Sequence, residues 1–156
     1  GYAVLVFEAG NPDPFGRAQL YHSATGAVEN LPFASPVELP STCNPDWLVM
    51  AETVSLNGRE RRSIHVRAVA EQGGAWHQIL TAVSYVQWDE ACQSMMAVAG
   101  STIRWVTFPD ADLIGEWKMS PYEAMPGLPS PDGRAWAMVG SYSGRQETAL
   151  MIVRRP

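Results

Sequence analysis

Turn chemistry and strand chemistry meet in one stretch, Ser130-Pro131-Asp132-Gly133-Arg134-Ala135-Trp136-Ala137-Met138-Val139. Proline presets φ in a tight turn, aspartate accepts hydrogen bonds from its own turn, and glycine takes the positive φ that other residues resist. The residues from Trp136 to Val139 are mostly bulky and apolar, which is typical of a strand. The stretch therefore predicts a turn that leads directly into a strand.

Two earlier stretches repeat this arrangement in weaker form. Asn44-Pro45-Asp46-Trp47 keeps the proline and the aspartate, and Trp88-Asp89-Glu90-Ala91-Cys92 is a degenerate copy without proline or glycine. Four apolar strands recur at intervals of 44, 48 and 41 residues, counted from their first residues: Ala3–Phe7, Trp47–Ala51, Met95–Ala99 and Trp136–Val139. A recurrence at this spacing indicates an internal repeat.

Each apolar strand begins a predicted meander. A polar hairpin tip follows it at Gly10–Gly16, Ser55–Arg61, Gly100–Ser101 or Ser141–Gln146, and then a partner strand at Gln19–His22, Ile64–Val69, Ile103–Val106 or Ala149–Val153. A further strand follows the first three pairs at Val28–Phe33, Trp76–Thr81 and Leu113–Met119, and another strand then leads into the next repeat. A unit of about 40 to 50 residues with four short antiparallel strands is the period of a β-propeller blade.

We therefore predict an all-β chain, a β-propeller-like array of about four antiparallel blades in a single domain. The repeats cover approximately residues 1–36, 37–83, 84–121 and 122–156. The strands number three, four, four and three, whereas a closed four-bladed ring needs about sixteen. We expect the array to be incomplete or to be completed by another chain. A strand-rich sandwich that mimics the repeat is the alternative.

Composition narrows the function classes. The chain has 156 residues, 46% of them hydrophobic and 17% charged, which is typical of a globular protein. Its net charge of −5 argues against nucleic acid as a partner, because phosphate binding needs lysine and arginine. No apolar run approaches the roughly 20 residues that span a bilayer. Cys43 and Cys92 are too few for a disulfide scaffold, which leaves isolated thiols or a single bridge.

Candidate chemical sites are weak, and we predict no catalytic residue, cofactor or metal. His22 and His65 occupy matching strands, but no carboxylate or cysteine stands beside them at ligand spacing, so we expect partly exposed histidines. Gly140-Ser141-Tyr142-Ser143-Gly144 is one residue away from a nucleophile elbow and has no following helix. The oxygen-rich segments Glu8–Gly16 and Pro109–Asp112 do not have the spacing of a calcium loop.

A partner surface is the remaining expectation. Arg59, Arg61 and Arg62 form a basic hairpin tip that could bind carboxylates through bidentate guanidinium contacts. Trp76 and Trp117 lie on predicted outer strands, where aromatic residues can bind another protein. A solvated tip and packing between blades are the alternatives. The predicted partners are another protein or further copies of the chain.

The stretch Ser130–Gly133 resembles the Ser-Pro-Asp-Gly turn of TolB-type (PD40-like) β-propeller repeats, and Asn44-Pro45-Asp46 is similar to it. WD40-like repeats are a poorer match, because the only Trp-Asp pair, Trp88-Asp89, precedes a second strand instead of closing a third. The TolB-type resemblance implies a non-catalytic scaffold for protein–protein interaction in the bacterial envelope, periplasmic or extracellular. The alternatives are a fragment of the substrate-gating propeller of a serine peptidase and a carbohydrate-binding propeller.

Overall fold

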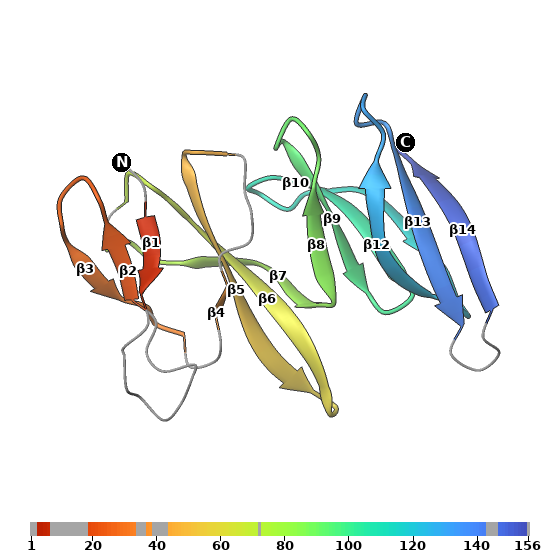
Figure 1. Ribbon diagram of the computed structural model, residues 1–156, viewed down its shortest axis with the longest axis horizontal. Helices are drawn as coiled ribbons and strands as arrows, with labels where there is room; N and C mark the ends of the chain where they lie inside the picture. The colour runs from red at the N-terminus through yellow and green to blue at the C-terminus, as the bar shows by residue number, and fades with distance from the viewer. Residues whose placement is uncertain are drawn as a thin grey trace. The chain divides into compact units, whose positions relative to one another are not determined.

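The computed structural model describes residues 3–6, 19–33, 37–38, 44–71, 73–142 and 147–155. This part of the chain contains fourteen strands and no helix (Figure 1). The strands are β1 (Ala3–Val6), β2 (Gln19–His22), β3 (Val28–Asn30), β4 (Val37–Glu38), β5 (Trp47–Leu56), β6 (Arg59–Ala68), β7 (His77–Val83), β8 (Tyr85–Trp88), β9 (Ser94–Ala99), β10 (Thr102–Thr107), β11 (Leu113–Lys118), β12 (Glu123–Pro129), β13 (Ala135–Tyr142) and β14 (Glu147–Arg154).

These strands form four antiparallel sheets in chain order. The first sheet is β1-β2-β3, the second β4-β5-β6-β7, the third β8-β9-β10-β11 and the fourth β12-β13-β14. Each strand lies beside its neighbour in the sequence, which is the up-and-down order of a propeller blade. The predicted fold class is confirmed, including three, four, four and three strands among the described residues.

The chain divides into two compact units, Gly1–Gln78 and Ile79–Pro156, and the division falls within β7. In the first unit, buried apolar side chains join the first sheet to the second: Leu20, Leu31, Leu48 and Met50, with Phe33, Val69 and Trp76 against them. In the second unit a larger core joins the third sheet to the fourth: Met96, Val98, Ile103, Trp105, Met119, Ala124, Trp136, Met138 and Val153. Each unit therefore stacks two sheets face to face. The single domain stays a prediction.

The β5–β6 hairpin corrects one predicted boundary. Its strands run on to Leu56 and Arg59, so most of the predicted tip at residues 55–61 is paired strand. The turn itself is Asn57-Gly58, with φ of 51° and 72°, which is the two-residue turn that matches strand twist. Polar composition suggested a loop, but backbone pairing extends a hairpin without needing apolar side chains. The basic cluster therefore lies on β6.

Candidate functional site

The Ser130–Gly133 turn has the geometry that its sequence predicts. The backbone N–H of Gly133 donates to the Ser130 carbonyl at 2.9 Å, and Gly133 has a φ of 64°. Asp132 Oδ1 accepts from the Arg134 backbone N–H at 3.1 Å and from the Ser130 hydroxyl at 2.5 Å. The Ser130 hydroxyl oxygen also accepts from the Ala135 N–H at 2.9 Å. These hydrogen bonds hold the turn where β12 passes into β13.

The corresponding turn before β9 reaches the same shape with different residues. Cys92 stands in the place of Gly133 and has a φ of 56°. Buried Asp89 holds the loop: its two carboxylate oxygens accept from the Gln93 backbone N–H at 3.0 Å and from the Ser94 hydroxyl at 2.7 Å. Ser94 Oγ in turn accepts from Trp105 Nε1 at 2.7 Å. A buried side-chain network thus replaces the proline and glycine of the stronger signature.

The redox state of the cysteines was left open by the sequence. Cys92 is buried and disulfide-bonded, whereas Cys43 lies outside the described residues.

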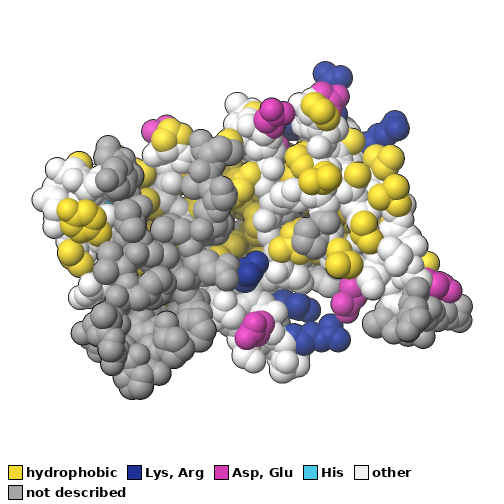
Figure 2. Space-filling model, in the orientation of Figure 1, with side chains coloured by type: hydrophobic (Ala, Val, Ile, Leu, Met, Phe, Trp, Pro, Cys, Tyr) yellow, Lys and Arg dark blue, Asp and Glu magenta, His cyan; other side chains and the backbone are white. Residues whose placement is uncertain are grey.

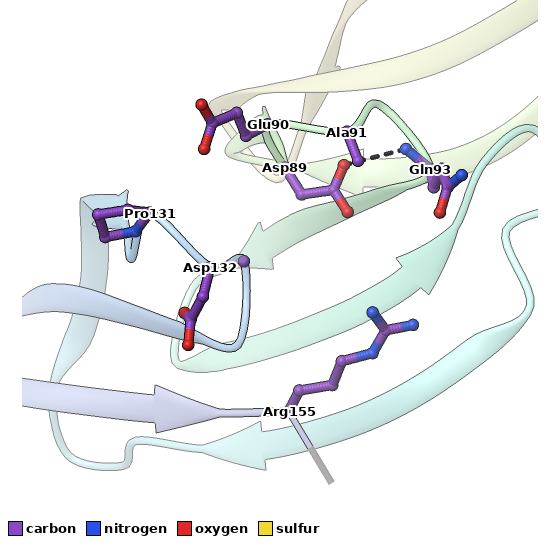
Figure 3. Close-up of a pocket in the computed structure, with 8 residues that line it drawn as sticks. Asp89, Glu90, Ala91, Gln93, Pro131, Asp132 and Arg155 are labelled. Carbon is purple, nitrogen blue, oxygen red and sulfur yellow. Dashed lines mark hydrogen bonds between the residues drawn. The ribbon is translucent and has the colours of Figure 1, made fainter.

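A pocket of about 320 Å³ lies between these two turns in the second unit. It is small but within the range of ligand pockets, which is roughly 300–1,000 Å³. Figure 3 shows the turn at Asp89–Gln93 and the turn at Pro131–Asp132 on different sides of it, with the Arg155 side chain reaching into the space between them. The lining residues are Asp89, Glu90, Ala91, Gln93, Pro131, Asp132, Gly133 and Arg155.

Charge in the pocket is of both signs. Both carboxylate oxygens of Asp89 are used within its own loop. The Ser130 hydroxyl, and then the Arg134 backbone N–H, lower the pKa of exposed Asp132, so this side chain is a stable anion. Glu90 is an exposed carboxylate that also lines the pocket. Arg155 is anchored through its backbone N–H to the Arg134 carbonyl at 2.8 Å, and its guanidinium lies 5.7 Å from the centre of the Trp105 ring. The pocket therefore offers an anchored cation beside exposed carboxylates.

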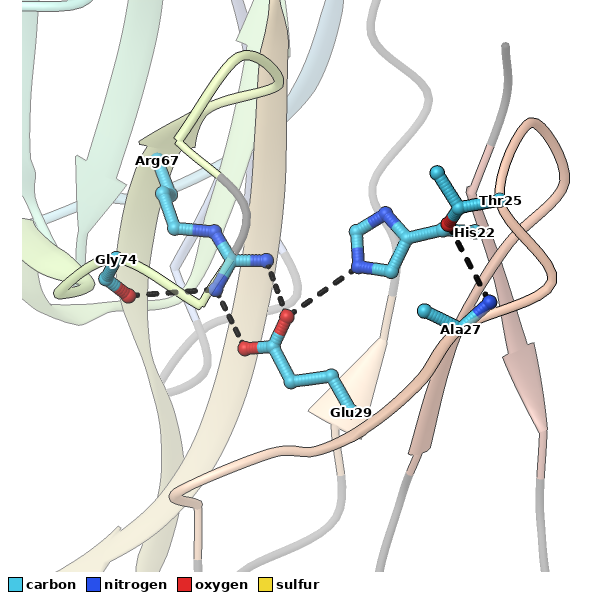
Figure 4. Close-up of polar contacts among 6 residues, drawn as sticks. All are labelled: His22, Thr25, Ala27, Glu29, Arg67 and Gly74. Carbon is cyan, nitrogen blue, oxygen red and sulfur yellow. Dashed lines mark hydrogen bonds and ion pairs between the residues drawn. The ribbon is translucent and has the colours of Figure 1, made fainter.

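A second polar cluster lies in the first unit (Figure 4). Arg67 on β6 is fully buried and forms a bidentate pair with Glu29 on β3, at 2.5 Å and 2.7 Å. Its guanidinium also donates to the Gly74 carbonyl at 3.3 Å and lies 4.6 Å from the centre of the Trp76 ring. His22 Nε2 is 3.3 Å from Glu29 Oε2. The cluster joins the first sheet to the second.

Hydrogen bonds from Arg67 are the main reason that the pKa of Glu29 lies below its ordinary value. The contact with His22 acts in the same direction, and partial burial opposes both. Glu29 is therefore held as an anion against a buried cation. This arrangement stabilises a charge pair, and both oxygens of the carboxylate are already engaged.

The histidines are more buried than the sequence suggested. His22 is 7% exposed and His65 9%, so the expectation of partly exposed histidines was wrong. Each is near a glutamate on the neighbouring strand, His22 at 3.3 Å from Glu29 and His65 at 3.2 Å from Glu52. Both pairs are diagonal across an antiparallel register, where side chains share one face. These histidine–glutamate pairs could have been predicted from the register of each hairpin, but not from short ligand spacings along the sequence.

The predicted partner residues do not form one site. Arg59 is the first residue of β6 and is exposed. Arg61 and Arg62 lie further along the same strand and are partly buried. Trp76 belongs to the first unit, half-buried beneath Arg67. Trp117 on β11 belongs to the second unit, half-buried with its ring centre 6.4 Å from that of Trp105. Their role in binding a partner stays a prediction.

Other candidate segments add no site. The Glu8–Gly16 segment and Ser143-Gly144 lie outside the described residues. The Asp110–Asp112 segment is a turn in which the Asp112 N–H donates to Thr107 Oγ1 at 3.0 Å. Within the described ranges no three His, Cys, Asp or Glu side chains gather as a metal site would require. No helix in the described part is long and apolar enough to cross a membrane.

Comparison with known proteins gives a fold and no family. No protein-family model matches the chain. No curated protein matches it. The chain is similar to the β-propeller domain of the Trilobed protease from Pyrococcus furiosus, with 10% identity and a TM-score of 0.47 over 88% of this chain and 60% of that one. It is also similar to the dihydro-heme d1 dehydrogenase NirN in complex with DHE, with 14% identity and a TM-score of 0.52 over 99% of this chain and 38% of that one.

The chain thus spans 60% and 38% of the length of these two structures. At such low identity a likeness carries the fold alone. Four antiparallel sheets in chain order, together with the likeness to NirN, show that this chain has a β-propeller fold.

Proposed function

We propose that the chain is a non-catalytic binding module of the β-propeller type, and that the pocket between the turns of the third and fourth sheets holds a segment of another protein. The TolB-type assignment is part of this proposal. It is supported by the Ser130–Gly133 turn, whose hydrogen bonds and positive φ match the predicted roles of its aspartate and glycine. The same resemblance supports a periplasmic or extracellular location.

The observation that carries the proposal is the charge arrangement of the pocket. Arg155 is fixed at its backbone and lines a space that also contains the exposed carboxylates of Glu90 and Asp132. A peptide segment carries backbone donors and acceptors and side chains of both signs. It can therefore satisfy a cation and nearby anions together, and a bidentate contact from arginine to a peptide carboxylate would fix its orientation.

The non-catalytic part is supported by how the buried polar groups are used. Asp89 and Ser94 hold a turn, and Arg67 with Glu29 joins two sheets. His22 and His65 each contact a glutamate of a neighbouring strand. Groups that activate a nucleophile need one partner left for the substrate. These groups are committed to the architecture instead.

The test begins with a random peptide library displayed on phage and selected against the whole chain. Recovered peptides are then measured by isothermal titration against Arg155→Ala. We expect about a tenfold or greater loss of affinity, because a charge-assisted bidentate contact contributes roughly 1.5–3 kcal/mol. Arg154→Ala is the matched control: Arg154 is also exposed and adjacent, but it does not line the pocket.

Equal affinity for wild type and Arg155→Ala would overturn the pocket as the binding site. A library that yields no binder above background would count against a peptide-binding module as a whole.

A further inference from the structure

The fourth sheet has an apolar face that the structure leaves open. Two rows of paired residues cross its three strands, Met125–Val139–Leu150 and Leu128–Ala137–Ile152. Leu128 and Leu150 are each 74% exposed, Ile152 62% and Met125 47%. Figure 2 shows apolar side chains gathered over β12–β14. We call these six residues the open face. Monomeric proteins rarely expose so continuous an apolar surface without using it.

The third sheet has a face that corresponds to the open face of the fourth sheet. Met96 lies four residues after Cys92, and Ala137 lies four residues after Gly133, the matching turn position. By the same alignment of the two turns, Val98 corresponds to Val139, since each lies six residues after its turn position. On the neighbouring strand, Ile103 is paired with Val98 as Leu150 is paired with Val139. The open face is therefore the counterpart, position by position, of one face of the third sheet.

In the third sheet that face is fully covered. Met96, Val98, Ile103 and Trp105 are 0–1% exposed because Trp136 and Met138 of the fourth sheet pack against them. The first sheet uses its corresponding face in the same way, through Leu20, which packs with Leu48 and Met50 of the second sheet. Each sheet thus has a later face, which points toward the next sheet along the chain, and an earlier face on its other side. In each unit the later face of the first of its two sheets packs on the earlier face of the second.

The first sheet has an exposed earlier face, which is the side opposite to the one that packs on the second sheet. On the first sheet, Tyr21 and Val28 are directly paired and point away from the side that buries Leu20. They are 37% and 57% exposed. Beside them, Gln19 Nε2 donates to Asn30 Oδ1 at 3.0 Å, so the amide pair satisfies part of its own hydrogen bonding. These four described side chains carry no formal charge that docking would have to desolvate.

We propose that the open face of the fourth sheet docks on the Tyr21–Val28 face of the first sheet in a second copy of the chain. The contact is heterologous, since two different surfaces meet, and it extends the stacking that each unit already contains. Polar residues border the apolar rows, with Ser141 paired to Thr148 at one end and exposed Arg154 at the other. An apolar centre with a polar border is the usual anatomy of an interface between proteins.

The experiment is sedimentation velocity of the whole chain over a wide concentration range. Wild type should associate reversibly above the 17.1 kDa of one chain. Leu150→Glu/Ile152→Glu and, separately, Val28→Glu should each raise the dissociation constant by about tenfold or more, because burying a carboxylate against an apolar face is unfavourable. Leu113→Glu is the matched control, an exposed leucine (61%) on β11 outside both faces, and it should associate like wild type.

A mixing step identifies the two surfaces. The Leu150→Glu/Ile152→Glu variant keeps the first-sheet face, and Val28→Glu keeps the open face, so an equimolar mixture should associate more strongly than either variant alone. Wild type that stays monomeric at every concentration overturns the proposal. If Val28→Glu associates as strongly as wild type, the first sheet is not the surface on which the open face docks. Circular dichroism checks that each variant remains folded, and peptide binding through Arg155 is measured separately, so either proposal can fail alone.

Discussion

Two stacked interfaces of this protein bring sheets together by different means. Between the first and second sheets, a small apolar cluster is accompanied by buried Arg67, its bidentate partner Glu29 and the histidine beside it. Between the third and fourth sheets, the contact is almost wholly apolar and centred on Trp105 and Trp136, whose rings meet edge to face with centres 6.3 Å apart. The same repeat therefore supports an ionic interface and an aromatic one.

The difference teaches where each unit is vulnerable. An apolar interface responds to lost volume and is nearly indifferent to pH. A buried charge pair offsets a large desolvation cost only while both partners keep their charges, so it responds to acid and to the loss of one partner. Four predictions break or sharpen this contrast.

The largest effect is expected from Trp136→Ala. Trp136 is fully buried at the centre of the second unit, and removing such a ring costs about 3–5 kcal/mol of unfolding free energy. Hydrogen exchange measured by mass spectrometry should accelerate most in peptides from β9, β10 and β13. Trp117→Ala is the control: Trp117 is only half-buried against the same core and should have a smaller effect. A greater acceleration of hydrogen exchange in the first unit would contradict the placement of Trp136 at the centre of the second unit.

The next effect is expected from Glu29→Gln, at about 3 kcal/mol near neutral pH, because it leaves the Arg67 charge buried without its anion. Exchange should accelerate in β2, β3 and β6, the strands of the first unit that the cluster joins. Glu116→Gln is the matched control. Its carboxylate meets Arg104 at 2.8 Å, and both side chains are exposed, so solvent screens the pair and we expect no resolvable change.

The Glu29 contribution should also depend on pH. The pKa of Glu29 is lower in the folded chain than in the unfolded one, chiefly because Arg67 stabilises the anion. Its contribution is therefore fully present above the unfolded value of about 4.3 and is lost as pH falls through the folded value. The difference between wild type and Glu29→Gln in urea midpoint should be constant from neutral pH down to that region and then shrink. A difference that grows in acid would contradict the charge pair.

The smallest effect is expected from Gly133→Ala. Nothing lies within 4 Å of the Cβ that this substitution adds, so the cost is conformational, about 1 kcal/mol for holding an alanine at a φ of 64°. Gly133→Asn is the control, because asparagine tolerates this region better and should cost less. The measurement is the thermal midpoint. Equal values for all three proteins would show that the turn is not held at positive φ in solution.

The strand pattern and the turns could be predicted from the sequence. Trp136–Val139 and its counterparts are local signals: short apolar runs set off by proline, glycine and aspartate, recurring at blade spacing. They gave fourteen strands in groups of three, four, four and three, as the described residues show. The Ser130–Gly133 turn was predictable for the same reason, since every bond that holds it joins residues within five positions of one another.

Only the tertiary structure decided the polar clusters, the pocket and the open face. Arg67 and Glu29 stand 38 residues apart, and nothing local in the sequence pairs them. The pocket exists because two turns face each other whose matching positions, Cys92 and Gly133, are 41 residues apart. Leu150 is exposed because no sheet of the described residues covers it, although Ile103 at the matching position is buried. Periodicity and turn chemistry depend on neighbours along the chain. Which faces meet, and which charges lose water together, depends on how the finished sheets stack.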